Sequence, residues 1–144
     1  MGEDIINKAI PVGNLIKKPC VTRNLRLHGY AQNTGTDKWD YVYGSDIGKI
    51  NMLIGEDSNF STLLHEDFSF ITAHVVWAVR EEMALTVEDV LARRIRLLFL
   101  DARKAIEISP VIASIMAKEL NKDKSWENDQ VTEFTKLAQE YILL

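Results

Sequence analysis

The sequence predicts an all-α protein, a compact bundle of five or six short helices that carries an irregular N-terminal arm. Two observations lead to this prediction. From residue 45 onward, apolar residues recur at helical spacing between residues that favour helix starts and ends. Residues 11–44, in contrast, are rich in proline, glycine and polar residues, a composition typical of loop and extended chain. We therefore divide the chain into an arm at 1–44 and a helical domain at 45–144.

The arm is expected to begin with a short amphipathic helix at residues 3–10. Acidic residues in its first turn complement the helix dipole, and Pro11 is expected to end it because the residue before a proline avoids the helical region. The apolar residues of this helix fall on one stripe: Ile5, Ile6, Ala9 and Ile10. Few neighbours in the sequence could bury the stripe. We therefore expect this helix to be the end of a larger unit, and residues 11–44 to be a linker that lies on a partner surface.

The first two helices of the helical domain have recognisable ends. Ser45 can cap a short helix that stops at Gly55. After a loop at 55–70, Thr72 can cap a second helix whose apolar positions run to Met83. No segment from residue 72 onward alternates like a half-buried strand, which supports the all-α class.

Three further start signals follow. Thr86 and the acid three residues later, Asp89, fit the start of a capped helix. Asp101 can begin another segment. Ser109-Pro110 is a start signal because proline suits the first position of a helix. A closing helix is expected from about 126 to 142.

Composition excludes several classes of protein. The 144 residues fit one domain, and a net charge of −4 argues against a nucleic-acid binder, which usually carries a basic patch. The single cysteine, Cys20, rules out an internal disulfide and favours a reducing compartment. No apolar run approaches the roughly 20 residues that cross a bilayer, and the acidic start is unlike a signal peptide.

The sequence predicts no catalytic, cofactor-binding or metal-binding residues. The three histidines, His28, His65 and His74, do not combine with Cys20 in a zinc spacing. A buried thiol is the favoured interpretation of Cys20, over a nucleophile paired with His28. We expect His74 to be a packed or half-exposed side chain. There is no strand followed by a GxGxxG turn and a helix, so no dinucleotide site is expected in this chain.

The most distinctive feature of the sequence is a basic cluster, Arg93, Arg94 and Arg96. Guanidinium groups could clamp a phosphate or a carboxylate. They could also pair with Asp89 one turn earlier, or dock this domain on another, and we favour this structural or interface interpretation. An exposed ion pair contributes only about 0.3–0.5 kcal/mol. Three clustered arginines therefore suggest a role beyond a single exposed ion pair.

Residues 77–104 resemble the C-terminal domain of FAD-dependent glycerol-3-phosphate dehydrogenases and the related alpha-glycerophosphate oxidases. Residues 23–29 are similar to the link segment of that family, and residues 1–10 look like the helix that follows its last flavin-contacting motif. Arg80 also lies on the family pattern and completes the set of candidate interface or structural residues. The positions that fall on the pattern are Arg80, Glu82, Ala84, Thr86, Asp89, Leu91, Arg93, Arg94, Arg96, Phe99, Leu100 and Asp101.

This resemblance implies a parent enzyme that oxidises glycerol 3-phosphate to dihydroxyacetone phosphate. A hydride passes to FAD, and electrons then pass to quinone in the dehydrogenases or to oxygen in the oxidases. In the family the flavin and substrate residues lie upstream, so none of them is carried over to this chain. The parent dehydrogenase is expected in the cytoplasm, at the inner face of the cytoplasmic membrane.

We therefore expect a non-catalytic domain, inactive alone and without its own FAD, that packs on the upstream FAD and substrate domain of the same polypeptide. It could also contribute to dimer formation or acceptor access, and the parent could be a peripheral membrane protein. The alternative is an independent all-α protein-interaction module with a peptide or protein partner. A third reading, an enzyme in its own right, needs a site that the sequence does not show.

Overall fold

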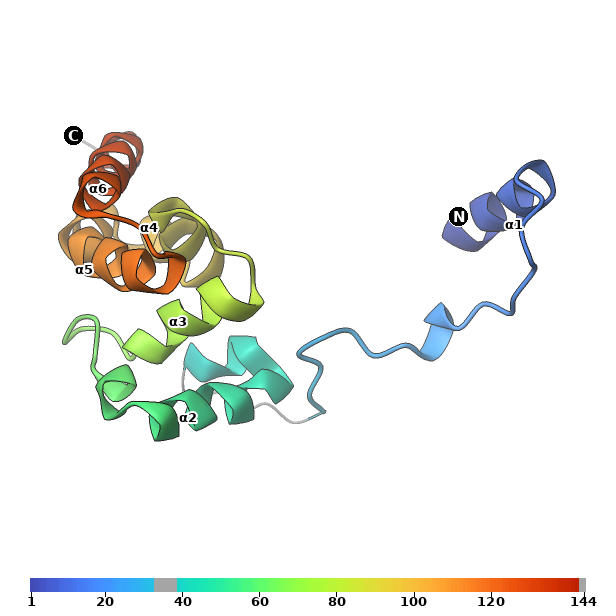
Figure 1. The fold of residues 1–144 in the computed structure, drawn as a ribbon, viewed down its shortest axis with the longest axis horizontal. Coiled ribbons are helices and arrows are strands. Elements are labelled where there is room, and N and C mark those ends of the chain that lie inside the picture. The colour runs from blue at the N-terminus through green and yellow to red at the C-terminus, as the bar shows by residue number, and fades with distance from the viewer. Residues whose placement is uncertain (33–38, 143–144) are drawn as a thin grey trace.

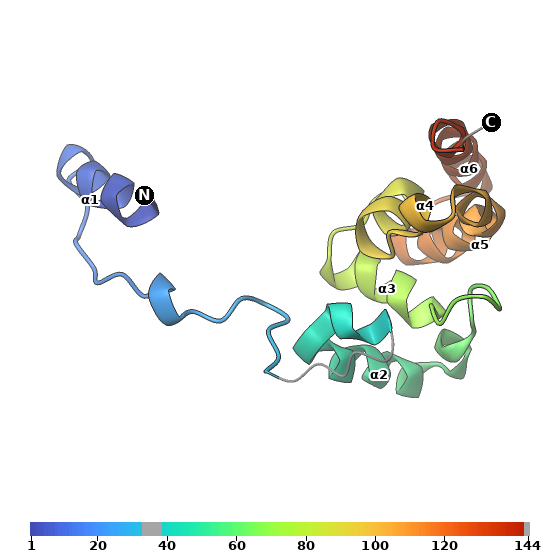
Figure 2. The ribbon, with the colours of Figure 1, turned by 180° about the vertical axis from the view of Figure 1, so that it is seen from behind.

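The computed structural model describes residues 1–32 and 39–142. The described residues form helices and turns, with one isolated antiparallel bridge between Leu63 and Ile71 and no strand, so the predicted all-α class is confirmed. Helices α2 to α6 gather into one body, whereas α1 lies apart at the end of an extended arm (Figures 1 and 2).

The α-helices have the following bounds: α1 Gly2–Val12, α2 Ile47–Glu56, α3 Thr72–Glu81, α4 Leu97–Leu100, α5 Ala102–Leu120 and α6 Lys124–Gln139. Shorter helical turns lie between them: Thr22–Asn24, Trp39–Asp46 and Ser58–Ser61 are 3-10 turns, and Asp89–Arg94 is a π-helical segment. Five α-helices thus follow residue 45, within the predicted number.

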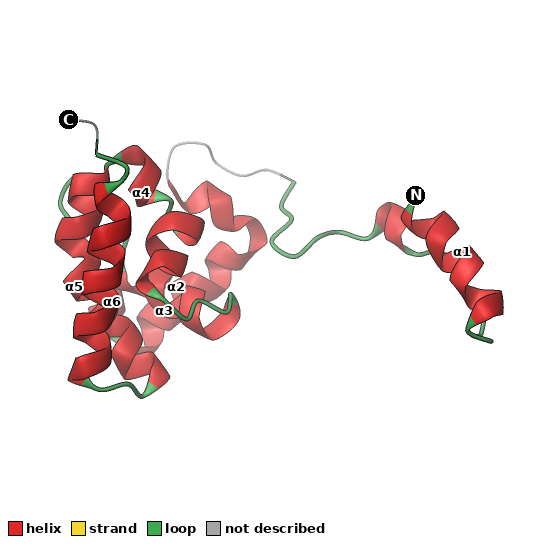
Figure 3. Cartoon of the chain, turned by 90° about the horizontal axis from the view of Figure 1, so that it is seen from above, coloured by secondary structure: helices red, strands yellow, loops and turns green. Residues whose placement is uncertain are grey.

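The core consists of two buried clusters that meet at α3. One cluster joins α3 to α4, α5, α6 and the π-helical segment, and it includes the buried side chains of Ile112 and Phe134. The other joins α3 to α2 through Ile50 and Trp77. The helices α5 and α6 lie side by side (Figure 3). Full burial of such side chains contributes about 1.5–3 kcal/mol each, so packing rather than helix propensity holds this body together.

The predicted helix start at Thr86 is confirmed by its hydrogen bonds. The Asp89 amide donates to the Thr86 hydroxyl at 3.1 Å, and the Asp89 carboxylate accepts from the Thr86 amide at 3.0 Å. This is a reciprocal capping box. The segment that follows is wider than an α-helix, because the Ile95 amide bonds to the carbonyl of Val90, five residues earlier.

The predicted helix start at Ser109-Pro110 is wrong, because α5 runs unbroken through both residues. Proline has no amide hydrogen, so it cannot bond to the carbonyl of Ile106 four residues earlier. The buried hydroxyl of Ser109 donates to that carbonyl instead, at 2.8 Å. Because the lost bond is replaced locally, the helix continues.

The α3 helix ends earlier than its apolar spacing predicts. Its last residue is Glu81, and Met83 takes a left-handed conformation, with φ 58°, and is 82% exposed. The amide of buried Ala84 then bonds to the carbonyl of Ala78, which turns the chain back over the helix end. Apolar spacing alone does not reveal this turn.

The arm differs from the predicted arm at both ends. The first helix does not stop before Pro11 but includes it and ends at Val12, although Pro11 has no amide to donate to the carbonyl of Asn7. Residues 33–38 of the predicted loop lie outside the described residues. Beyond them the chain is already helical, and Tyr43 is buried in the second cluster. The division at residue 44 stays a prediction.

Candidate functional site

Arg80, at the end of α3, is tied to two other helices. Its guanidinium forms a two-pronged bond to Glu119 of α5, at 2.7 and 3.1 Å, and reaches Glu56 of α2 at 3.3 Å. It also lies over the ring of Phe60, at 5.8 Å. The hydrogen bond to Glu119 raises the pKa of Arg80; partial burial opposes that rise, and the charges of Glu119 and Glu56 add to it. The guanidinium of Arg80 is therefore paired within the helical body and links three of its helices.

Arg93 and Arg94 are also paired within the chain. Arg93 contacts Glu88 at 2.6 Å and Asp89 at 2.8 Å. Arg94 contacts the Glu82 carboxylate at 3.3 Å and donates to the Glu82 carbonyl. The structure therefore distributes these guanidinium groups over separate carboxylates and does not assemble them into one phosphate clamp.

Arg96 differs from the other three candidates. It takes a left-handed conformation, with φ 61°, at the start of α4, and its side chain is exposed. Within the described part of the chain, the Arg96 side chain forms no hydrogen bond or ion pair. Left-handed backbone costs a residue with a side chain about 1–2 kcal/mol. Of the four predicted residues, Arg96 is thus the one available for a contact outside this body.

The ionised carboxylate of Asp89 caps the start of the π-helical segment. Burial disfavours that form, but hydrogen bonds from the Leu85 amide and from Thr86, together with the charge of Arg93, outweigh burial and lower the pKa of Asp89. The carboxylate is therefore ionised at neutral pH and acts as a structural cap.

A second ionic cluster, which the sequence did not reveal, fastens the loop before α3 to α5. Lys104 contacts Asp67 at 2.5 Å, and His65 lies 3.4 Å from Lys104 and 3.7 Å from Glu107. The hydrogen bond from Lys104 lowers the pKa of Asp67, against a smaller opposing effect of burial. These residues lie far apart in the sequence, so no local spacing could have predicted the cluster.

His74 and Cys20 differ in burial, and neither belongs to a cluster of potential metal ligands among the described residues. His74 is buried, in line with the expected packed side chain; its Nδ1 accepts from the Ile71 amide, and its ring stacks on Tyr43 at 5.0 Å. Cys20 is exposed, so the interpretation of a buried thiol is wrong: the arm around it has no core. No group of three or more potential ligand side chains that could hold a metal occurs in residues 1–32 and 39–142.

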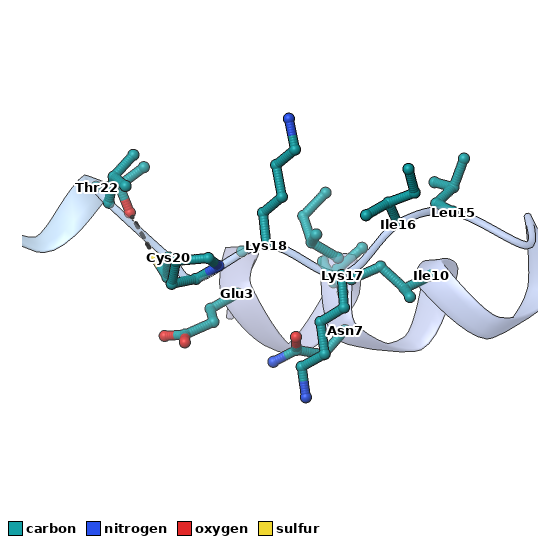
Figure 4. A pocket seen from close by; sticks show the side chains of 14 residues that line it. Glu3, Asn7, Ile10, Leu15, Ile16, Lys17, Lys18, Cys20 and Thr22 are labelled. Atoms are coloured by element: carbon teal, nitrogen blue, oxygen red, sulfur yellow. Dashed lines mark hydrogen bonds between the residues drawn. The ribbon is translucent and has the colours of Figure 1, made fainter.

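The arm carries an exposed apolar surface beside a groove. Helix α1 buries none of its residues, and Ile5 and Ile6 are 65% and 61% exposed. Together with the chain that follows it, α1 lines a groove of about 800 Å³, where Ile10, Leu15 and Ile16 lie close to one another (Figure 4). A contiguous apolar patch of this kind is typical of a surface that another protein covers.

The described residues do not fit a flavin dinucleotide. Such a cofactor needs a glycine-rich turn between a strand and a helix, whose amides bind the pyrophosphate. The part of the chain that the structure describes holds no strand, and its two glycines of positive φ are packed against protein atoms: Gly44 against the backbone of Gly29, and Gly29 against the carbonyl of Tyr43. No helix among the described residues is long and apolar enough to cross a membrane.

Comparison with known proteins agrees with these features. The family described as the C-terminal domain of alpha-glycerophosphate oxidase matches residues 20–127. A probable mitochondrial glycerol-3-phosphate dehydrogenase of Dictyostelium discoideum is 31% identical over 87% of this chain and 21% of its own length. The mitochondrial glycerol-3-phosphate dehydrogenase of Rattus norvegicus is 30% identical over 84% of this chain and 19% of its own. No solved structure matches the chain.

The chain therefore spans about a fifth of the length of these relatives. The family match includes residues 77–104 and all four candidate arginines. Because that match covers about three quarters of the chain, this protein belongs to the family of C-terminal domains found in alpha-glycerophosphate oxidase and glycerol-3-phosphate dehydrogenase.

Proposed function

We propose that this chain is the C-terminal accessory domain of an FAD-dependent glycerol-3-phosphate dehydrogenase, and that it is inactive when isolated. The parent enzyme oxidises sn-glycerol 3-phosphate to dihydroxyacetone phosphate and passes the electrons to quinone. FAD, which the parent needs as the hydride acceptor, belongs to the upstream part of the parent. The observation that carries this proposal is a family match over three quarters of a chain that spans only about a fifth of its relatives.

The proposed partner is the upstream FAD and substrate domain of the same polypeptide, and the proposed contact surface is the arm. The apolar stripe of α1 is exposed at Ile5 and Ile6 and half-buried at Ile10, and each isoleucine that a partner buries would contribute about 1.5–3 kcal/mol. Arg96 supplies a second contact, because it is the candidate arginine without a partner in the described residues. Arg80, Arg93 and Arg94 support the helical body instead.

The cellular location and the oligomeric state of the parent enzyme are part of the same proposal. We place it in the cytoplasm, as a peripheral protein at the inner face of the cytoplasmic membrane, and as a dimer. The relatives compared above carry mitochondrial names, so cell fractionation of the full-length protein is the test of location. Light scattering of the purified parent tests the dimer.

A reconstitution experiment tests the proposed role. The upstream part of the parent is produced without these 144 residues, and its melting temperature and quinone-linked oxidation of glycerol 3-phosphate are measured with and without the added chain. We expect the chain to raise both quantities. The chain alone should show no flavin absorbance and no turnover. Stoichiometric flavin on the isolated chain, or no effect on the upstream part, would contradict the proposal, and the latter result would favour an independent interaction module.

A further inference from the structure

We propose that the arm is not a free tether, because residues 28–31 are fastened to residues 43–46 by a clip that fixes where the arm leaves the helical body. This clip, defined by those two segments, needs no upstream domain. The inference therefore stands or fails independently of the proposed function.

The backbone forms the first half of the clip. The Ser45 amide donates to the carbonyl of Gly29 at 3.1 Å. The two chains approach so closely that a Cβ atom added at Gly44 would lie 1.8 Å from the Gly29 carbonyl oxygen. Gly44 also has a positive φ of 52°. Only glycine fits this position without moving the backbone.

Side chains form the second half. His28 Nε2 lies 2.6 Å from the Asp46 carboxylate, and Lys49 contacts the other oxygen of that carboxylate at 3.1 Å. Asp46 is 5% exposed, whereas the His28 side chain reaches it from the surface. A buried carboxylate that loses a partner pays a desolvation cost, so this contact favours the closed clip.

The two sides of the clip belong to different parts of the molecule. Asp46 directly precedes α2, and Tyr43 is packed in the core beside α3, so residues 43–46 are fixed to the helical body. No residue from 1 to 32 is buried. The clip is therefore the place where an otherwise exposed arm is held by the body.

A closed clip has a consequence for any partner that the arm binds. An arm that leaves the body in a set direction orients the helical body on that partner. Binding then requires less ordering of the chain than binding through a flexible linker would. Gly44, His28 and Asp46 thus act as positioning residues.

Hydrogen exchange of the Ser45 amide, measured by NMR on the whole 144-residue chain, tests the clip. We expect Gly44→Ala to speed this exchange by about tenfold or more, because the acceptor carbonyl is pushed away. Gly48→Ala is the matched control: a Cβ there meets nothing within 4 Å, and Ser45 exchange should not change. The amides of buried residues such as Val76 should exchange slowly in every variant.

A second variant covers the case in which Gly44→Ala unfolds the chain. His28→Ala removes an exposed side chain with no role in the core, and should speed Ser45 exchange by at least about threefold. A spin label on Cys20, the single cysteine, should also become more mobile in the clip variants than in Gly48→Ala. An unprotected Ser45 amide in the unmodified chain would overturn the inference. So would unchanged Ser45 exchange in His28→Ala and, where it folds, in Gly44→Ala.

Discussion

Ile112 in the helical body is fully buried, whereas Ile5 in the arm is 65% exposed, although both lie on helices with an apolar stripe. The stripe of α5 faces α3 and α6, but the stripe of α1 belongs to neither buried cluster of the described chain. The same local pattern thus gives a stable core in one region and an uncovered surface in the other. The difference teaches that an apolar stripe stabilises the fold where another helix covers it, and is left to bind a partner where none does.

The same substitution in both regions gives the largest expected contrast. Ile112→Ala leaves a cavity in the core and should lower the free energy of unfolding by about 2–5 kcal/mol. Ile5→Ala should change it by less than about 0.5 kcal/mol, since nothing in the chain buries that side chain. Urea unfolding followed by circular dichroism measures both. A comparable loss in Ile5→Ala would show that the arm packs on the body.

The replaced hydrogen bond in α5 gives the next largest effect. Ser109→Ala leaves the Ile106 carbonyl without its donor, and should cost about 1–3 kcal/mol of stability. Adding Pro110→Ala restores a backbone amide that can bond to this carbonyl, so the double variant should recover part of the loss. A thermal unfolding series of the two single variants and the double variant measures this coupling. Strictly additive effects would refute the proposed replacement.

Asp89→Asn tests the capping box and should cost about 0.5–2 kcal/mol at neutral pH. The pKa of Asp89 in the folded chain is below its ordinary value of 3.8. Its contribution is therefore fully present above that ordinary value and is lost as the pH falls through the lowered pKa. The difference from the unmodified chain should shrink in acid. Asp129→Asn, at an exposed position of α6, is the control and should leave the free energy of unfolding nearly unchanged at neutral pH.

The smallest expected effect has the opposite sign. Arg96→Gly relieves the left-handed backbone and should stabilise the isolated chain by about 1 kcal/mol. Arg94→Gly should destabilise it, because it breaks the contact with Glu82. Differential scanning calorimetry would detect both shifts in melting temperature. A loss of stability in Arg96→Gly would indicate that Arg96, too, serves the helical body.

These contrasts show which features were predictable. The all-α class and the capping box at Thr86 depend on local spacing, and the sequence contains that information. The continuity of α5 depends on whether Ser109 can replace the missing bond of Pro110, which local propensity does not reveal. The clusters around Arg80 and Lys104 join residues far apart in the chain. The sequence singles out four candidate arginines, but only packing separates Arg96 from the three that are paired within the chain.

Calorimetric titration of the upstream FAD domain with this chain tests most directly whether the arm is the docking surface. The account predicts that Ile5→Asp weakens binding by at least about tenfold, since it places a charge on the stripe that the upstream domain would bury. Val111→Asp, at an exposed apolar position on the helical body, should leave the Kd within about twofold. Equal affinity of the unmodified chain and Ile5→Asp would contradict the account.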